Sequence, residues 1–219
     1  LLDVVGGLYS WYYSLVENIN KEDTDPELEA LVAELTKGKT SDLEKVKALY
    51  YWTQKNIKYI AFEYALGGFI PREANDVFQK KYGDCKDNSS ILYKMLEIAG
   101  LEGNLTWIGT RKIPYTYEEA VDNHMILSYE YNNKTYYLDA TGRYIQIDYP
   151  SSFIQGKEAL IANGKSYKIK KIPVVEAHLN TITDSTYLKI SGRDIIGSSQ
   201  TKLSGYLKNN LFYNLENTR

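Results

Sequence analysis

The pattern that most constrains the fold is a helical repeat over residues 85–99, which begins at Cys85, the chain's only cysteine. Its apolar residues recur at helical spacing, and Gly100 follows as the expected C-terminal stop. Helical patterns also dominate the residues before it, whereas the residues after it alternate as strands do. This order, with helices first and strands after them, predicts an α+β domain in which the helix that begins at Cys85 is central.

Start and stop signals give the other expected elements their bounds. A capping-box pattern at residues 41–44 begins one helix, and Asn132-Asn133 and Asn163-Gly164 each form a turn between two strands. Further helices are expected over residues 1–19, 27–35, 73–81 and 203–215. Strands are expected over residues 57–62, 104–110, 124–131, 135–139, 145–147, 158–162, 166–172 and 180–190.

Cys85 stands in the block Tyr82-Gly83-Asp84-Cys85-Lys86-Asp87. A cysteine at a helix N-terminus meets free backbone N–H groups and the positive end of the helix dipole, and both favour the thiolate, which is the nucleophilic form. A lone cysteine is usually a small buried hydrophobic residue, but the flanks here are charged and polar. We therefore interpret Cys85 as a nucleophile, with a buried structural cysteine as the alternative, and the flanking acids as helix caps.

His124 and Asp139 are the candidate partners of the cysteine. His124 begins one predicted strand and Asp139 ends the strand that returns after the Asn132-Asn133 turn. Antiparallel pairing brings such positions to the same end of a hairpin. A nucleophile, a base and a group that orients the base are the parts of a catalytic triad. The alternative for Asp139 is a plain strand-end residue before a turn.

Together these blocks resemble the transglutaminase-like superfamily of cysteine enzymes, and more narrowly the transglutaminase-like domains of larger exported proteins of Bacteroidetes-type bacteria. The resemblance runs from residue 41 to residue 173 and rests on residues 51–59, 67–72, 82–87, 123–124 and 138–141. It implies a papain-like core whose central helix, with the nucleophile Cys85 at its start, packs on an antiparallel sheet. It also implies His124 as base and Asp139 as orienter, without a cofactor. Many members follow the histidine with a small residue and Trp, whereas this chain has Met125 and Ile126.

The resemblance implies acyl transfer from an amide bond through a thioester. Hydrolysis, by a peptidase or amidase, is favoured over protein cross-linking because the sequence shows no feature that would exclude water. The expected substrate is a peptide or protein, such as a cell-envelope peptide, and the expected location is the periplasm or cell envelope. The alternative is a non-catalytic domain that binds protein or glycan, or acts as a scaffold, within a larger envelope protein.

Two residues are candidates for the second donor to the oxyanion, after the backbone N–H of Cys85. These are Gln54 and Tyr59, which lie in the blocks that carry the resemblance. Arg72 and Glu73 are candidate substrate contacts, although charged loop residues are usually solvated. The loop from Tyr115 to Glu119 is a candidate cover for the groove.

Composition argues against several other functions. Lys and Arg together number 26 and Asp and Glu 28, for a net charge of −2, so no basic surface suggests nucleic acid as a partner. No apolar run approaches the length of about 18 residues that predicts a transmembrane helix. Cys85 and His124 lack the paired ligands of a structural zinc site, so no metal is expected. His178 is expected at the surface.

The sequence divides into two parts at Pro173. Residues 1–173 are interpreted as a transglutaminase-like domain with N-terminal helices. Residues 174–219 are interpreted as a linker and the start of a following β-rich domain. Further domains are expected to flank this chain in the full-length protein.

Overall fold

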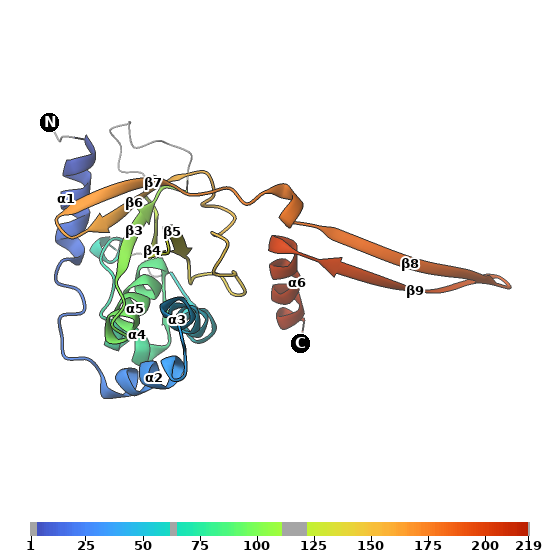
Figure 1. Cartoon of the computed structure of the whole chain (residues 1–219), viewed down its shortest axis with the longest axis horizontal. Coiled ribbons are helices and arrows are strands. Elements are labelled where there is room, and N and C mark those ends of the chain that lie inside the picture. The colour runs from blue at the N-terminus through green and yellow to red at the C-terminus, as the bar shows by residue number, and fades with distance from the viewer. Residues whose placement is uncertain (1–3, 62–64, 111–121, 219) are drawn as a thin grey trace. The chain divides into compact units, whose positions relative to one another are not determined.

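The computed structural model describes residues 4–61, 65–110 and 122–218 of the 219-residue chain (Figure 1). It divides into two units, Leu1–Pro173 and Val174–Arg219. The predicted cover of the groove, residues 115–119, lies outside the described residues.

An antiparallel sheet of five strands, in the order β5-β4-β3-β6-β7, forms the frame of the first unit. The hairpin between β4 and β5 closes through Asn132 and Asn133, whose φ angles of 49° and 62° are those of a tight hairpin turn. The turn between β6 and β7 includes Gly164, at φ 58°. The strands are β3 (Gly103–Ile108), β4 (His124–Tyr131), β5 (Lys134–Leu138), β6 (Glu158–Asn163) and β7 (Ser166–Lys171).

The central helix, α5 (Cys85–Ile98), packs on strands β3 and β4 (Figure 1). Its contacts with α2, α3 and α4 enclose it from the other sides. The α5 side chains that face these neighbours are fully buried, and each contributes about 1.5–3 kcal/mol through the hydrophobic effect: Ile91, Leu92, Met95 and Leu96. The surrounding helices are α2 (Pro26–Thr36), α3 (Asp42–Asn56) and α4 (Ala74–Lys80).

The first helix, α1 (Val4–Val16), packs against the sheet through aromatic residues. The Tyr12 ring stacks on Trp107 of β3 with centroids 5.1 Å apart, and Tyr9 packs its ring against Tyr167 of β7. Tyr9 and Tyr12 of α1 are therefore part of the apolar core.

A second apolar cluster covers the other face of the sheet. It joins Ile108 of β3 and Ile126 of β4 to Ile154, which is fully buried although it belongs to the long segment between β5 and β6. This segment is thereby fixed against the sheet beside the ends of β4 and β5, where His124 and Asp139 lie.

A two-strand parallel sheet precedes the central helix. It pairs β1 (Lys58–Tyr59) with β2 (Tyr82–Gly83), and Tyr59 lies opposite Gly83. A side chain at Gly83 would place its Cβ 2.4 Å from the Cβ of Asp87, so only glycine fits at this approach to the helix. The described part of the strand expected over residues 57–62 shortens to these two residues, and two-residue strands leave no alternating pattern to detect.

The strand expected over residues 145–147 is wrong. Side chains of α3 hold this segment instead of a neighbouring strand: Gln54 Nε2 donates to the carbonyl of Ile145 at 3.1 Å, and the Tyr51 hydroxyl accepts from the Ile147 N–H at 3.2 Å. These bonds satisfy the backbone without a sheet.

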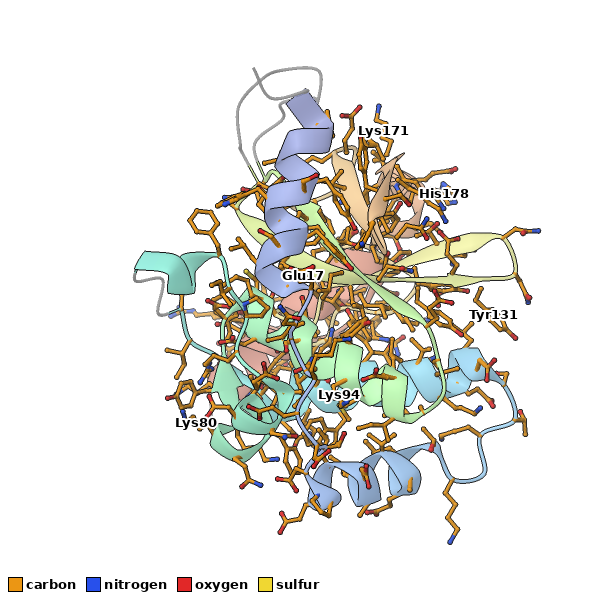
Figure 2. All side chains as sticks on the ribbon, turned by 90° about the vertical axis from the view of Figure 1, so that its left-hand side faces the viewer. Glu17, Lys80, Lys94, Tyr131, Lys171 and His178 are labelled. Atoms are coloured by element: carbon orange, nitrogen blue, oxygen red, sulfur yellow. The ribbon has the colours of Figure 1, made fainter. Side chains whose placement is uncertain are left out.

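The second unit contains a long hairpin followed by a helix. Strands β8 (Ile182–Ser191) and β9 (Asp194–Leu203) pair along their whole length, and α6 (Gly205–Asn217) follows. His178 of this unit, labelled in Figure 2, lies at the surface as predicted and pairs with Glu176 at 3.0 Å. Within the described residues of both units, no helix is long and apolar enough to cross a membrane.

Candidate active site

The start of α5 is a capping box that leaves the Cys85 N–H available. The Asp84 carboxylate accepts from the N–H groups of Lys86 and Asp87, at 2.9 and 3.3 Å, and the Asp87 carboxylate accepts in return from the Asp84 N–H at 3.1 Å. The two acids are therefore helix caps, as predicted. No hydrogen bond within the described residues uses the N–H of Cys85, which as the first helical residue has no partner inside the helix.

Buried ion pairs fix this helix start. Lys86 Nζ pairs with Asp84, and both side chains are only 5% exposed. Arg72 contacts Asp87 through Nε at 3.0 Å and Nη2 at 2.9 Å, and Nη2 also donates to the Tyr82 carbonyl at 2.6 Å. Breaking a fully buried pair such as Lys86–Asp84 typically costs about 3–5 kcal/mol, because one charge is left uncompensated. The backbone that carries Cys85 is therefore held from both sides.

His124 and Asp139 meet at the end of the β4–β5 hairpin. His124 Nε2 lies 3.0 Å from Asp139 Oδ2. The ladder pairs Leu127 with Leu138, so continuing the same register would set Asp139 opposite Ile126 rather than opposite His124. The contact is therefore diagonal across the hairpin, which the length of a histidine side chain spans.

The Asp139 carboxylate accepts hydrogen bonds from several donors in addition to His124. Its Oδ1 accepts from the Thr141 N–H at 3.2 Å and from the Thr141 hydroxyl at 2.6 Å, and its Oδ2 accepts from Ser151 besides His124. The Tyr50 hydroxyl donates to the Asp139 carbonyl at 3.1 Å. Burial raises the pKa of the Asp139 carboxyl, but the charge of His124 and these hydrogen bonds outweigh burial and lower the pKa below its ordinary value.

His124 contacts both the acid and the thiol. Burial lowers the pKa of His124, but the charge and hydrogen bond of Asp139, followed by the hydrogen bond and charge of Cys85, raise the pKa from 6.5 to about 10. Because Nε2 is bonded to Asp139, Nδ1 is the ring nitrogen left for the thiol. The arrangement therefore favours an imidazolium between two groups that can carry negative charge.

The surroundings of Cys85 are unlike those of a core cysteine. The residue is 4% exposed, yet it belongs to neither apolar cluster. Its neighbours in the first turn are the buried polar residues Lys86, Asp87 and Asn88. The Ser89 hydroxyl lies 2.9 Å from the carbonyl oxygen of Cys85 and 3.1 Å from the carbonyl oxygen of Met125 in β4, and it can donate to either. The helix that carries the thiol and the strand that carries the imidazole are thus joined directly.

The candidates for the second oxyanion donor separate in the structure. Gln54 is 4% exposed and its amide bonds to the Ile145 carbonyl, so its role is to hold that segment. Tyr59 is 45% exposed and lies opposite Gly83, close in the backbone to Cys85. Tyr59 therefore remains a candidate for the second oxyanion donor, whereas Gln54 does not.

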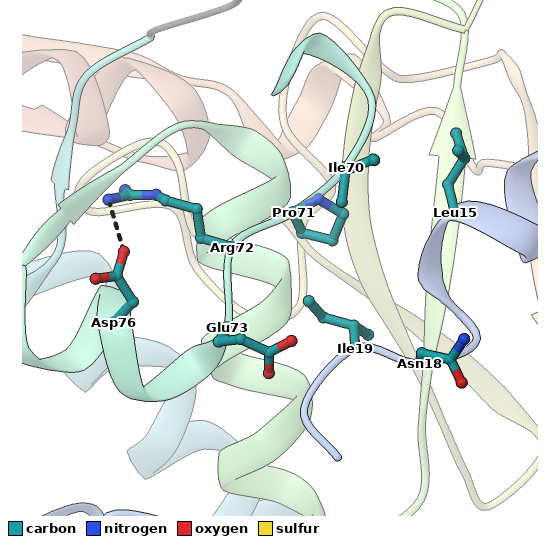
Figure 3. A pocket seen from close by; sticks show the side chains of 8 residues that line it. All are labelled: Leu15, Asn18, Ile19, Ile70, Pro71, Arg72, Glu73 and Asp76. Carbon is teal, nitrogen blue, oxygen red and sulfur yellow. Dashed lines mark hydrogen bonds and ion pairs between the residues drawn. The ribbon is translucent and has the colours of Figure 1, made fainter. Parts of the chain in front are cut away.

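Arg72 and Glu73, the candidate substrate contacts, line a pocket of about 420 Å³ between α1 and α4 (Figure 3). Figure 3 shows Arg72 joined to Asp76, and Glu73 accepts from the Asn20 N–H at 2.7 Å. Cys85, His124 and Asp139 do not line this pocket. Both residues therefore serve the scaffold around the helix start.

Sequence reasoning missed Ser151 and Phe153. Ser151 is 1% exposed and bonds to Asp139. The Phe153 ring packs against His124 with centroids 5.2 Å apart and an interplanar angle of 64°. Both belong to the irregular segment between β5 and β6, where no periodic pattern reports which residues turn toward the site.

The His124–Asp139 pair predicts how stability depends on pH. Because folding raises the pKa of His124 from 6.5 to about 10, the stabilisation is complete below about 6.5 and is lost as pH rises through 10. Because folding lowers the pKa of Asp139 from 3.8, its stabilisation is present above that value and is lost as pH falls below it. We expect the melting temperature to fall by several degrees from pH 6 to pH 10.5.

Thermal melts of the wild type and of Asp139→Asn at the two pH values measure this effect. The difference between the two proteins should shrink at alkaline pH, because the wild type then loses the charged histidine that Asp139 stabilises. An equal difference at both pH values would contradict the assignment.

Comparisons with known proteins agree with this architecture. Residues 29–111 match the model of the transglutaminase-like superfamily. The chain is similar to a crystal structure described as a putative protease from Parabacteroides distasonis, with a TM-score of 0.58 and 16% identity over 83% of this chain and 37% of that chain. It is also similar to a structure described as a putative cysteine protease from Cytophaga hutchinsonii, with a TM-score of 0.46 and 15% identity over 80% of this chain and 50% of that chain. Comparison with curated proteins gave no match.

These matches differ in what they cover. The family model includes Cys85 and the start of α5, whereas His124 and Asp139 lie beyond its last matched residue. The chain spans about 37% of the length of the Parabacteroides protein, and the similarity to it concerns the fold. The similarity to the Parabacteroides structure, at a TM-score of 0.58, shows a shared fold. Residues 29–111, which include Cys85, therefore match the transglutaminase-like superfamily.

Proposed function

We propose that the chain is a cysteine hydrolase that cleaves amide bonds through a thioester on Cys85. The observation that carries the proposal is the position of His124, whose Nε2 lies 3.0 Å from Asp139 Oδ2 and whose ring also has the Cys85 side chain as a hydrogen-bonding partner. A nucleophile, a base and an oriented acid in this arrangement are the parts needed for covalent acyl transfer.

The proposed reaction begins with an imidazolium on His124, which is the charge that balances a Cys85 thiolate. Sγ attacks the substrate carbonyl, and the Cys85 N–H at the start of α5 donates to the oxyanion. Tyr59 is the proposed second donor. His124 then gives its proton to the leaving amine as the carbonyl–nitrogen bond breaks, and it later takes a proton from the water that hydrolyses the thioester.

Asp139 acts through His124 in this scheme. Its carboxylate is saturated by donors from Thr141 and Ser151, so it stays ionised and fixed in one orientation. A fixed acceptor at Nε2 keeps Nδ1 directed to the thiol and stabilises the imidazolium. This arrangement favours an enzyme over the non-catalytic alternative, because a binding domain gains nothing from a buried charged histidine beside a thiol.

The proposed substrate is a peptide or protein, and water is the proposed acceptor. A cell-envelope peptide as the substrate and a location in the periplasm or cell envelope stay predictions. So does the view that Val174–Arg219 begins a following domain.

The proposal predicts a covalent intermediate that depends on Cys85. The chain should cleave members of a degenerate peptide library, with the products identified by mass spectrometry. Rapid acid quenching should trap the protein with the mass of an acyl group, and Cys85→Ala should show neither cleavage nor added mass. Addition of an amine such as glycine amide distinguishes hydrolysis from transfer, because a transferase would give amide products. Cleavage that persists in Cys85→Ala would contradict the proposal.

A further inference from the structure

Phe153 is an apolar ring placed outward beside the imidazole of the site. It is 45% exposed, yet its ring contacts His124 with centroids 5.2 Å apart. A single exposed aromatic residue is common on protein surfaces and needs no explanation by itself. The feature that distinguishes Phe153 is its contact with a buried histidine that also contacts a thiol and a carboxylate.

The backbone on both sides of Phe153 is anchored. Ser151 before it bonds to Asp139, and Ile154 after it is fully buried in the second apolar cluster. The Ile154 N–H donates to the Ser151 carbonyl at 3.1 Å, and Lys157 Nζ donates to the carbonyl of Phe153 itself. Such a turn holds the exposed ring in place, so a ligand that contacts it loses little conformational entropy in the protein.

The side of the substrate that meets this ring follows from the proposed chemistry. In the step that forms the thioester, the Sγ–carbon bond forms, the carbon–nitrogen bond breaks, and the His124 proton goes to the departing amine. The amine must therefore lie within reach of His124, and the residue that carries it lies next to the ring that packs on His124.

The side chains of the residues that follow His124 in the chain cannot contact the amine side of the substrate. Met125 and Ile126 are 2% and 1% exposed and belong to the two apolar clusters. Their side chains pack in the core, whereas the Phe153 ring remains open to solvent. The apolar surface beside the imidazole is therefore supplied by the segment between β5 and β6.

We propose that Phe153 is a specificity-determining residue that contacts an apolar side chain on the amine side of the cleaved bond. The proposal rests on the proposed function, since it names the substrate preference of the same site. Contact between two apolar groups in such a site is worth about a tenfold preference, and more when the contact excludes water fully. A small polar side chain in the same place would leave the Phe153 ring uncovered.

The test is the cleavage profile of a degenerate peptide library, read by mass spectrometry for the residues on both sides of each cleaved bond. The wild type should enrich Leu, Met and Phe directly after the cleaved bond. Phe153→Ala should lower this enrichment about tenfold and leave the preference on the acyl side unchanged. Phe153→Leu should restore most of it, because the side chain stays apolar.

Phe69→Ala is the matched control. Phe69 is 43% exposed, and its ring packs on Trp11 of α1, with centroids 5.0 Å apart, rather than on His124. This variant should keep the wild-type profile. Two peptides that differ only in having Leu or Ser directly after the cleaved bond give a second readout. Phe153→Ala should change the ratio of kcat/KM for the Leu peptide to kcat/KM for the Ser peptide. A purely structural role would lower kcat/KM for both peptides by the same factor.

Each outcome is informative. Cleavage by the wild type without apolar enrichment on the amine side, or enrichment that survives in Phe153→Ala, overturns the role of Phe153 and leaves the hydrolase intact. Enrichment lost equally in Phe69→Ala overturns it as well. Absence of any Cys85-dependent cleavage by the wild type contradicts the proposed function, and the role of Phe153 is rejected with it.

Discussion

His124→Ala is expected to lower kcat/KM about a thousandfold or more, because in the proposed mechanism the imidazole moves the proton in both half-reactions. Members of a triad act as a unit, so their effects are not additive. A double substitution of Cys85 and His124 by alanine should therefore be little worse than Cys85→Ala alone. Steady-state kinetics on one cleaved peptide, with the melting temperature of each variant, measure both effects. Additive losses in the double variant would contradict a shared mechanism.

Asp139→Asn extends the same series and should leave more activity than His124→Ala. In the proposed mechanism the carboxylate only orients and stabilises the imidazole, so its loss weakens the base without removing it. The structure adds that this variant should also be less stable. Donors from Thr141 and Ser151 surround both oxygens, so one of them must face the new NH₂ group. A buried group left unsatisfied costs about 1–3 kcal/mol.

Measurement of turnover per folded molecule separates these two effects of Asp139→Asn. Ser151→Ala is the matched control, because it removes one donor to Asp139 and leaves the contact with His124. It should lower stability with a smaller loss of rate than Asp139→Asn. Unchanged turnover in Asp139→Asn would remove Asp139 from the site and support the plain strand-end alternative.

The site could be predicted from the sequence where local rules place its parts. The Asp84 and Asp87 caps follow from the residues at the start of a helical pattern, and the Asn132-Asn133 turn brings His124 near Asp139. Each of these features depends on neighbours within a few residues or on one hairpin register. The α+β architecture follows in the same way from the order of helical and alternating patterns.

The rest of the site depends on contacts between distant segments. Ser151 and Phe153 reach the site because Ile154 anchors an irregular segment against the sheet, and no periodicity reports such an anchor. Arg72 was a candidate substrate contact with a solvated loop charge as the alternative, but tertiary packing pairs it with the Asp87 cap. The sequence made Gln54 a candidate donor to the oxyanion. In the structure its amide donates to the Ile145 carbonyl instead. Long-range packing decides all of these roles.

The second prediction with a large expected effect concerns the reactivity of Cys85 at mildly acidic pH. Cys85 is the first residue of α5, at the positive end of the helix dipole, and the imidazolium of His124 lies beside its side chain. With a His124 pKa of about 10, this positive charge is present throughout the neutral and acidic range. The positive charge beside the sulfur should make Cys85 react with iodoacetamide faster than a model thiol at mildly acidic pH.

His124→Ala is the control that isolates the imidazolium, since it keeps the helix start and the capping box. Its alkylation rate at acidic pH should fall toward that of a model thiol. Cys85→Ser should fold and take up no label, because the chain has no other cysteine. Both variants should be compared at matched temperatures below their melting points, so that unfolding does not expose the thiol.

The measurement that tests the central claim most directly is therefore the iodoacetamide rate of Cys85 at pH 5.5, relative to a small-molecule thiol at the same pH. The account predicts a rate at least about tenfold above the model thiol for the wild type, and a loss of this excess in His124→Ala. A wild-type rate equal to or below that of the model thiol, in a protein shown to be folded, would identify Cys85 as a buried structural cysteine and contradict the account.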